Sequence, residues 1–241
     1  QTIGNAVIRY GAVEIGGFPH PFENINADLL FNDKKLIINA AQATLGGGNV
    51  RGTGFIEFLD FKNIPIKIRG EFDNVNLEIP KDFKTKGSGN VYLTGKWFPY
   101  ELGGNYNVTG GAVTSEFSSN KQGASKVKPS LFLPKLAGEQ NFEPIKLNFN
   151  IDMIQPVEVK NSIVAASVGG RIQITESPIY PRLTGKINVK KGGQIKFREN
   201  EFELDTSGII FNNSEPENPE LDIVANTQLD SGNITYEVNL R

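Results

Sequence analysis

The sequence predicts an all-β protein built from many short strands. Apolar and polar residues alternate with a period of two over most of the chain, which places the apolar side chains on one face of each strand. The chain of 241 residues contains 26 Gly and 16 Phe, a composition typical of β-structure with many turns. It shows no convincing amphipathic helix. We therefore expect about fifteen strands, most of them antiparallel.

A glycine-closed segment recurs along the chain. Residues 87–95 (GSGNVYLTG) repeat residues 46–54 (GGGNVRGTG) almost letter for letter, and residues 168–176 (VGGRIQITE) form a weaker third copy. Internal repetition indicates an architecture that grows by stacking one unit on the next. Such proteins form long surfaces or grooves and seldom hold a compact active site.

The predicted strands follow one another with short turns. In residues 64–69 the isoleucines share one face, and Gly-Gly, Asn-Asp or Pro-containing turns separate successive strands. In residues 147–153 four apolar side chains face one side, while two asparagines and an aspartate face the other. The same alternation continues to the carboxy terminus, in residues 172–174, 187–189, 195–197, 202–204, 209–211, 221–225 and 234–240.

The segment of residues 118–144 departs from the pattern. It is rich in Ser, Lys, Gln, Gly and Pro, and it contains an apolar island at residues 131–133. The segment is either a mobile loop whose island packs on the sheet, or a flap over an apolar groove. We expect one elongated unit that consists of an amino-terminal repeat region (1–117), a flexible loop (118–144) and a carboxy-terminal region (145–241).

The sequence lacks the residues that common catalytic and metal sites need. It has one His and no Cys, which excludes a cysteine nucleophile and the common zinc sites, and the two prolines that flank its one His argue against a Ser-His-Asp triad. The net charge of −2 argues against nucleic acid as a partner. Flanking prolines give His20 a structural or surface role. We expect no enzyme, no metal and no cofactor, and no segment has the 18 apolar residues of a membrane-spanning helix.

The carboxy-terminal region carries a family resemblance. Residues 183–211 read LTGKINVKKGGQIKFRENEFELDTSGIIF, and residues 219–225 read PELDIVA. The order is a glycine-closed strand, a Gly-x-Ile-x-Phe strand, a Phe-x-Leu strand, a second strand ending in Phe, and a Pro-x-Leu-x-Ile-x-Ala element. This order resembles the conserved carboxy-terminal region of the TamB family, the periplasmic subunit of the translocation and assembly module. Residues 1–117 are similar to the looser AsmA-like repeats of the same superfamily.

The resemblance implies an elongated, curved, folded-over β-sheet, or β-taco, with an apolar inner trough. Members bridge the two membranes of diderm bacteria and are implicated in moving phospholipid between them. They are also implicated in helping an outer-membrane barrel partner, a TamA-like protein, insert other barrels. The resemblance therefore implies a periplasmic location, with the inner-membrane anchor and most of the partner contacts in parts outside this chain. The family has no catalytic residues to carry over.

On this basis we expect the trough to bind phospholipid acyl chains and to carry them between the membranes. An apolar face that no second sheet covers can be filled by lipid tails, while the charged headgroup stays in water. The expected lining is the alternating apolar set Phe149, Ile151, Met153, Ile172, Ile174, Ile187, Val189, Ile195, Phe197, Phe202, Leu204, Phe211, Ile223 and Tyr236.

Three other interpretations stay open at this point. The same residues could form an ordinary closed core. The chain could be a scaffold that assists outer-membrane barrel assembly or autotransporter secretion, by pairing its free sheet edges with client strands. It could also be an adhesin or carbohydrate-binding solenoid, although the predicted outer faces carry few aromatic residues.

Overall fold

The computed structural model describes residues 3–16, 18–79, 81–116, 143–197, 200–231 and 234–240. These residues form sixteen strands and contain no helix. In chain order the strands are β1 (Ile3–Val13), β2 (Phe22–Asn32), β3 (Lys35–Leu45), β4 (Gly48–Glu57), β5 (Ile66–Glu78), β6 (Phe83–Gly95), β7 (Tyr100–Val113), β8 (Ile145–Lys160), β9 (Val164–Glu176), β10 (Pro181–Val189), β11 (Gln194–Phe197), β12 (Asn200–Leu204), β13 (Ser207–Ser214), β14 (Glu220–Asp222), β15 (Ala225–Ser231) and β16 (Ile234–Leu240).

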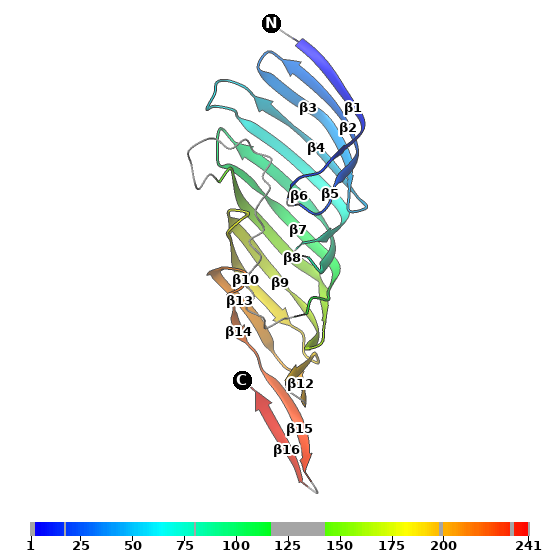
Figure 1. The fold of residues 1–241 in the computed structure, drawn as a ribbon, viewed down its shortest axis with the longest axis vertical. Coiled ribbons are helices and arrows are strands. Elements are labelled where there is room, and N and C mark those ends of the chain that lie inside the picture. Colours follow the sequence, from blue (N-terminus) through cyan, green and yellow to red (C-terminus); the bar gives the residue numbers. More distant parts are fainter. Residues whose placement is uncertain are drawn as a thin grey trace.

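All sixteen strands belong to one open sheet. From β1 to β9 each strand pairs with its neighbour in sequence, so the sheet grows along one axis as a stack of oblique strands (Figure 1). After β9 the sheet forks, because residues 168–176 of β9 pair with β10 whereas residues 164–165 pair with β11. One branch continues through β13 and β14, and the other through β12, β15 and β16. The predicted elongated all-β sheet is confirmed.

One pairing differs from the rest of the sheet. The pairs along the sheet are antiparallel except β7 and β8, which run parallel from Tyr100–Ile145 to Val113–Val159. A parallel neighbour cannot follow through a tight hairpin, because the chain must first return to the same end of the sheet. Residues 114–144 make this connection. Of the predicted loop 118–144, only residues 143 and 144 lie within the described residues.

The strands bend at a line of β-bulges. The register shifts between Phe72 and Val75 in β5, and corresponding shifts occur next to Gly87 in β6, Val108 in β7 and Met153 in β8. Val75 pairs with Gly87, Gly87 with Val108, and Val108 with Met153, so the bulges lie side by side. An extra residue in one strand bends that strand and increases its twist. The aligned bulges therefore crease the sheet lengthwise.

The β5 bulge shows how the chain stabilises such a bend. Asn74 has φ of 54°, in the left-handed region that asparagine tolerates better than most residues. Its amide N–H donates to Ser88 Oγ at 3.0 Å, and Ser88 Oγ donates to Asp73 Oδ1 at 2.7 Å. The amide that the bulge removes from the ladder thus keeps a partner on β6.

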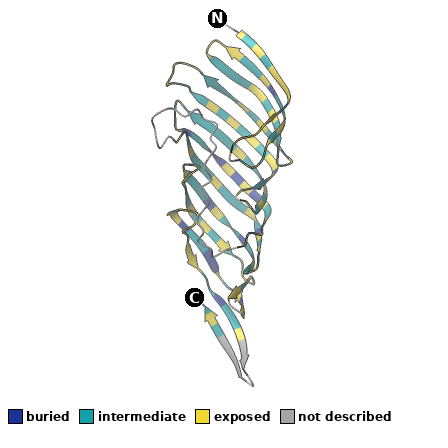
Figure 2. Ribbon diagram, viewed as in Figure 1, coloured by how far each residue is buried: buried dark blue, intermediate teal, exposed yellow. Residues whose placement is uncertain are grey.

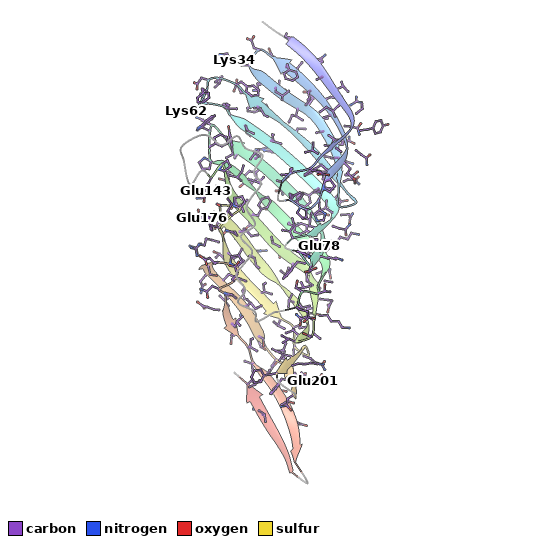
Figure 3. The ribbon with its side chains drawn as sticks, in the orientation of Figure 1. Lys34, Lys62, Glu78, Glu143, Glu176 and Glu201 are labelled. Carbon is purple, nitrogen blue, oxygen red and sulfur yellow. The ribbon has the colours of Figure 1, made fainter. Side chains whose placement is uncertain are left out.

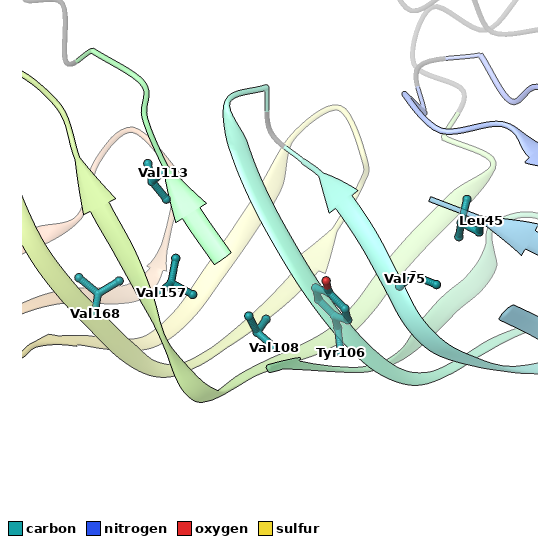
Figure 4. Packing of buried hydrophobic residues seen from close by; sticks show 7 residues of the cluster. All are labelled: Leu45, Val75, Tyr106, Val108, Val113, Val157 and Val168. Carbon is teal, nitrogen blue, oxygen red and sulfur yellow. The ribbon is translucent and has the colours of Figure 1, made fainter. Parts of the chain in front are cut away.

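Buried side chains lie along the crease. A main cluster consists of Leu45, Val75, Tyr106, Val108, Val113, Val157 and Val168, and Figure 4 shows these side chains on the bent strands. A second cluster, beyond the fork, consists of Ala166, Phe202, Leu204 and Ala225. Val189 packs against both clusters and so joins them.

Close pairing of β9 and β10 depends on glycine. Gly170 has φ of 148°, and a β-carbon there would lie 2.1 Å from the carbonyl oxygen of Lys186. The adjacent Gly169 has no such constraint, because the nearest atom to its β-carbon would be the Met153 carbonyl oxygen at 4.0 Å. The two glycines of one Gly-Gly pair therefore have different structural roles.

We predict that Gly170→Ala lowers the free energy of unfolding by about 1–3 kcal/mol, because alanine is strained at this φ and would push β10 away. Gly169→Ala is the matched control and should stay within about 0.5 kcal/mol of the parent. Urea unfolding followed by circular dichroism measures both values. Equal stability of the two variants would contradict the assigned role of Gly170.

Candidate functional site

The concave side of the creased sheet, here called the inner face, is the side that carries Val75 and Val108. Residues paired across neighbouring strands have their side chains on the same face, so the register extends this face along the sheet. One row, from β5 to β10 and β13, is Val75, Gly87, Val108, Met153, Gly170, Ile187 and Ile209. A second row, from β1 to β10, is Ile8, Ala27, Ala41, Gly52, Gly70, Val91, Gly104, Phe149, Ile174 and Leu183.

The side chains of the second row change in size along the sheet. From β2 to β5 it consists of Ala27, Ala41, Gly52 and Gly70, whereas from β8 to β10 it consists of larger apolar residues. Side-chain volume on a concave surface reduces the free space above it. The volume of side chains at the centre of the inner face is therefore smaller in the amino-terminal part of the sheet than in the carboxy-terminal part.

The inner face is apolar but only partly covered. Among the described residues, Val75 at 0% and Val108 at 1% exposure are the large side chains that are fully buried. Most of the other apolar residues on this face are half-buried. Figure 2 shows intermediate burial along much of the length of the strands. The described strands form one sheet, with no second sheet packed on it. The face is sheltered by the bending of its own strands.

The structure brings most of the sequence-predicted lining residues to this face. Ile151, Met153, Ile187 and Val189 pack against the main cluster. Phe202 and Leu204 belong to the second cluster. Ile195, Ile223 and Val189 pack against that second cluster. Pairing places Phe149, Ile172, Ile174 and Phe211 on the same face, outside both clusters.

Two of the predicted residues stand apart. Phe197 ends the short strand β11 and is 53% exposed, so it lies at the margin of the face. Tyr236 belongs to β16, but its side chain lies outside the described residues.

The sequence-based set omitted the amino-terminal half of the face. Val50, Phe72, Leu77 and Phe83 pack against the main cluster from β4, β5 and β6. The signal that could have found them is the alternation itself, since residues 66–72 show the same period of two as residues 147–153. The family resemblance is clearest in residues 145–241, and the predicted lining lies within them.

A segment of the chain's own backbone lies over part of this face. Residues 14–16 and 18–21, here called the strap, connect β1 to β2 and pass across the sheet toward β5 (Figure 1). Phe18 packs against the main cluster and stacks on Phe22 with 6.0 Å between ring centroids. His20 Nε2 accepts a hydrogen bond of 2.8 Å from the Glu78 amide. This contact is the structural role that the sequence predicted for the histidine.

Polar groups are concentrated on the opposite, outer face. Pairing aligns Asn90, Asn105, Asn150 and Gln173 across β6 to β9 on that face. The ion pair between Arg171 and Asp152 is also exposed there. Exposed ion pairs contribute little stability, so this pair is not what holds the sheet together.

Tyr106 is the main polar exception on the inner face. Its ring lies beside Gly87, where a β-carbon would be 2.5 Å from the ring. Its hydroxyl donates to Thr85 Oγ1 at 3.0 Å. Burial raises the pKa of Tyr106 above the ordinary tyrosine value of 10.0, because the phenolate would lose its hydration there.

The described residues lack a cluster of metal-binding side chains. No group of three or more His, Cys, Asp or Glu side chains in this part of the chain lies close enough to hold a metal ion. No helix that could cross a membrane occurs in the described ranges. What the site offers is a long apolar surface.

The family assignment rests on comparison with known proteins. The family model described as the TamB C-terminal domain matches residues 39–241, most of the chain. The chain belongs to the TamB family. The TamB match begins in β3 and continues to the last residue, so it includes the strands on both sides of the parallel β7–β8 pair. No curated protein matches the chain.

Membership of the TamB family confirms the resemblance seen in the sequence. The TamB family is associated with the cell envelope, and its general role is in outer-membrane assembly or lipid transport. It is a transport and assembly family and is not a known enzyme family. An open, creased sheet with one apolar face suits either of these roles.

We predict that the stability of this TamB-family chain falls as the pH rises above about 10, because tyrosines of the unfolded chain ionise there while Tyr106 keeps its proton. The contribution of Tyr106 to the free energy of unfolding is complete below pH 10 and is lost as the pH rises through the raised pKa of this residue. Tyr106→Phe should flatten this dependence, because it removes the buried hydroxyl. Unfolding free energies measured between neutral pH and pH 11 test this, and an unchanged slope for Tyr106→Phe would refute it.

Proposed function

We propose that this domain carries phospholipid acyl chains along its inner face, between the inner and outer membranes, in support of outer-membrane biogenesis. The observation that supports this proposal is the continuous apolar face that runs from β1 to the fork and has no second sheet over it. In a compact sandwich a facing sheet would bury these side chains. Here a lipid tail can take that place.

The energetics favour acyl chains as the cargo. Removing a methylene group from water gains about 0.8 kcal/mol, so a tail with about 15 buried carbons gains roughly 12 kcal/mol. Strands repeat at about 4.8 Å, which makes neighbouring positions along the trough nearly equivalent and keeps the barriers to sliding small. The charged headgroup remains in water at the opening of the trough, because burying it unpaired is costly.

The proposed lining residues divide by their exposure. Ile151, Met153, Ile187 and Val189 are half-buried and can contact a tail without rearrangement. Others of the proposed set are already covered by protein atoms and are proposed to maintain the shape of the face; these are Ile172, Phe202, Leu204 and Phe211.

The location and partners of the domain follow from the same proposal. A carrier between two membranes works in the periplasm, and we propose that a segment outside this chain anchors it in the inner membrane. We also propose that a TamA-like outer-membrane barrel is its protein partner, through parts largely outside this chain. No nucleic acid is expected, given the net charge of −2.

The alternative function is a scaffold for outer-membrane barrel assembly or autotransporter secretion. The observation that favours it is the open sheet, in which β1 and β16 stand at the two ends of the strand order. An unpaired strand edge can add a client strand through main-chain hydrogen bonds. Exposed Ile3, Val7 and Tyr10 on β1 would contribute apolar contacts to such pairing.

Photo-crosslinking in cells tests the primary proposal. A photoreactive residue at Phe149, on the inner face of β8, should give covalent phospholipid adducts in the full-length protein. The same residue at the adjacent Asn150, which is exposed on the outer face, is the matched control and should give none. Mass spectrometry identifies the adducts. Protein adducts at both positions without lipid would favour the scaffold instead.

A second test introduces charge into the face. Ile151→Asp should leave the sheet folded and abolish lipid adducts at position 149, because the half-buried carboxylate stays hydrated and repels a tail. Asn150→Asp, on the outer face, should have no effect. Val108→Asp should unfold the chain, since an unpaired charge at a fully buried site is strongly destabilising. A folded Ile151→Asp variant that still carries lipid would refute the proposed lining.

A further inference from the structure

Three hairpin tips are joined along one rim of the sheet. The tips are residues 33–34 between β2 and β3, residues 58–65 between β4 and β5, and residues 96–99 between β6 and β7, here together called the lip. Lys34 and Lys62 mark this rim in Figure 3, whereas Glu78 marks the opposite rim. Every second hairpin of the sheet ends here, so the lip follows from the topology.

Hydrogen bonds hold the three tips together. The Phe58 amide donates to the Lys34 carbonyl at 2.7 Å, and Lys34 Nζ donates to the Leu59 carbonyl at 3.4 Å. The Ile64 amide donates to the Lys96 carbonyl at 2.7 Å, and the Tyr100 hydroxyl donates to the Ile64 carbonyl at 2.9 Å. The tips therefore form a fixed surface, with several of their main-chain groups already engaged.

This fixed surface presents aromatic side chains to solvent. Phe58 is 50% exposed and Phe61 77% exposed, and Leu59 beside them is also exposed. The Phe61 ring lies 6.3 Å from the ring of Trp97, and Trp97 lies 4.8 Å from Phe98. Exposed apolar side chains that are clustered and held in place indicate an interaction surface.

Lysines accompany the aromatic side chains. Lys34, Lys62 and Lys96 lie in the lip with two carboxylates, Asp33 and Asp60. Asp60 Oδ1 accepts the Lys62 amide, so this carboxylate is directed into the loop. The lip therefore carries an excess of one positive charge around an aromatic centre.

We propose that the lip docks on the surface of a phospholipid bilayer that contains anionic lipid. Aromatic rings insert at the headgroup level of a bilayer, and lysines nearby are attracted to anionic headgroups. The lip also suits a bilayer better than a client strand, because several of its main-chain groups are already hydrogen-bonded within and between the three tips. This inference goes beyond lipid carriage, since it places one rim of the trough against a membrane and does not involve the inner face.

The chain supplies its own probe for this docking. Trp97 is its only tryptophan and lies within the lip. The test mixes the 241-residue chain with vesicles of phosphatidylcholine and phosphatidylglycerol. It measures co-sedimentation, Trp97 emission, and quenching of that emission by brominated acyl chains. We expect binding with a blue shift and with quenching by the brominated chains.

Phe61→Ser should weaken vesicle binding about tenfold, because it removes the most exposed ring of the lip. Ile79→Ser, at an exposed apolar residue on the opposite rim, is the matched control and should bind as the parent does. The folded Ile151→Asp variant should also dock normally, which separates failure of this proposal from failure of lipid carriage. Absence of vesicle binding, binding without a change at Trp97, or full binding by Phe61→Ser would each overturn the proposal.

Discussion

The lengthwise crease is the constraint on which the rest of the molecule depends. A single sheet cannot shelter its apolar face against a second layer, so the strands themselves must bend around it. The aligned bulges beside Val75, Gly87, Val108 and Met153 produce that bend, and the fully buried side chains lie next to it. Without the crease the same residues would form a flat, exposed apolar surface, which favours aggregation.

The crease separates two kinds of residue on the inner face, namely those that maintain the fold and those that can contact a ligand. Close to the crease, Val75 and Val108 are excluded from solvent and maintain the fold. Farther from it, residues such as Phe149 and Ile174 are only half-covered and remain able to contact a ligand. A protein that carries an apolar cargo needs both kinds of position, because a fully exposed face would not fold and a fully buried one would not bind.

Alternation in the sequence was sufficient to predict the strands and the shared face, because side-chain direction in a strand is a local property. It assigned Ile151, Ile187 and Val189 to one face, and all three pack against the main cluster. It failed to show that Phe197 lies at a margin, because β11 ends at that residue and pairing with its neighbours is not local. The bulge at Asn74, the strap over β5 and the joined tips of the lip depend on contacts between distant residues. No single stretch of sequence reveals such contacts.

The parallel step between β7 and β8 has a consequence for folding. Strands β1 to β7 pair with sequence neighbours, as do β8 to β10, so each set can form from local hairpins. Joining the sets requires closure of the connection formed by residues 114–144, which costs more chain entropy than a hairpin turn. Contacts between residues far apart in sequence slow folding. The two sets of strands are therefore expected to form early, and their union along β7 and β8 to limit the rate at which the complete trough appears.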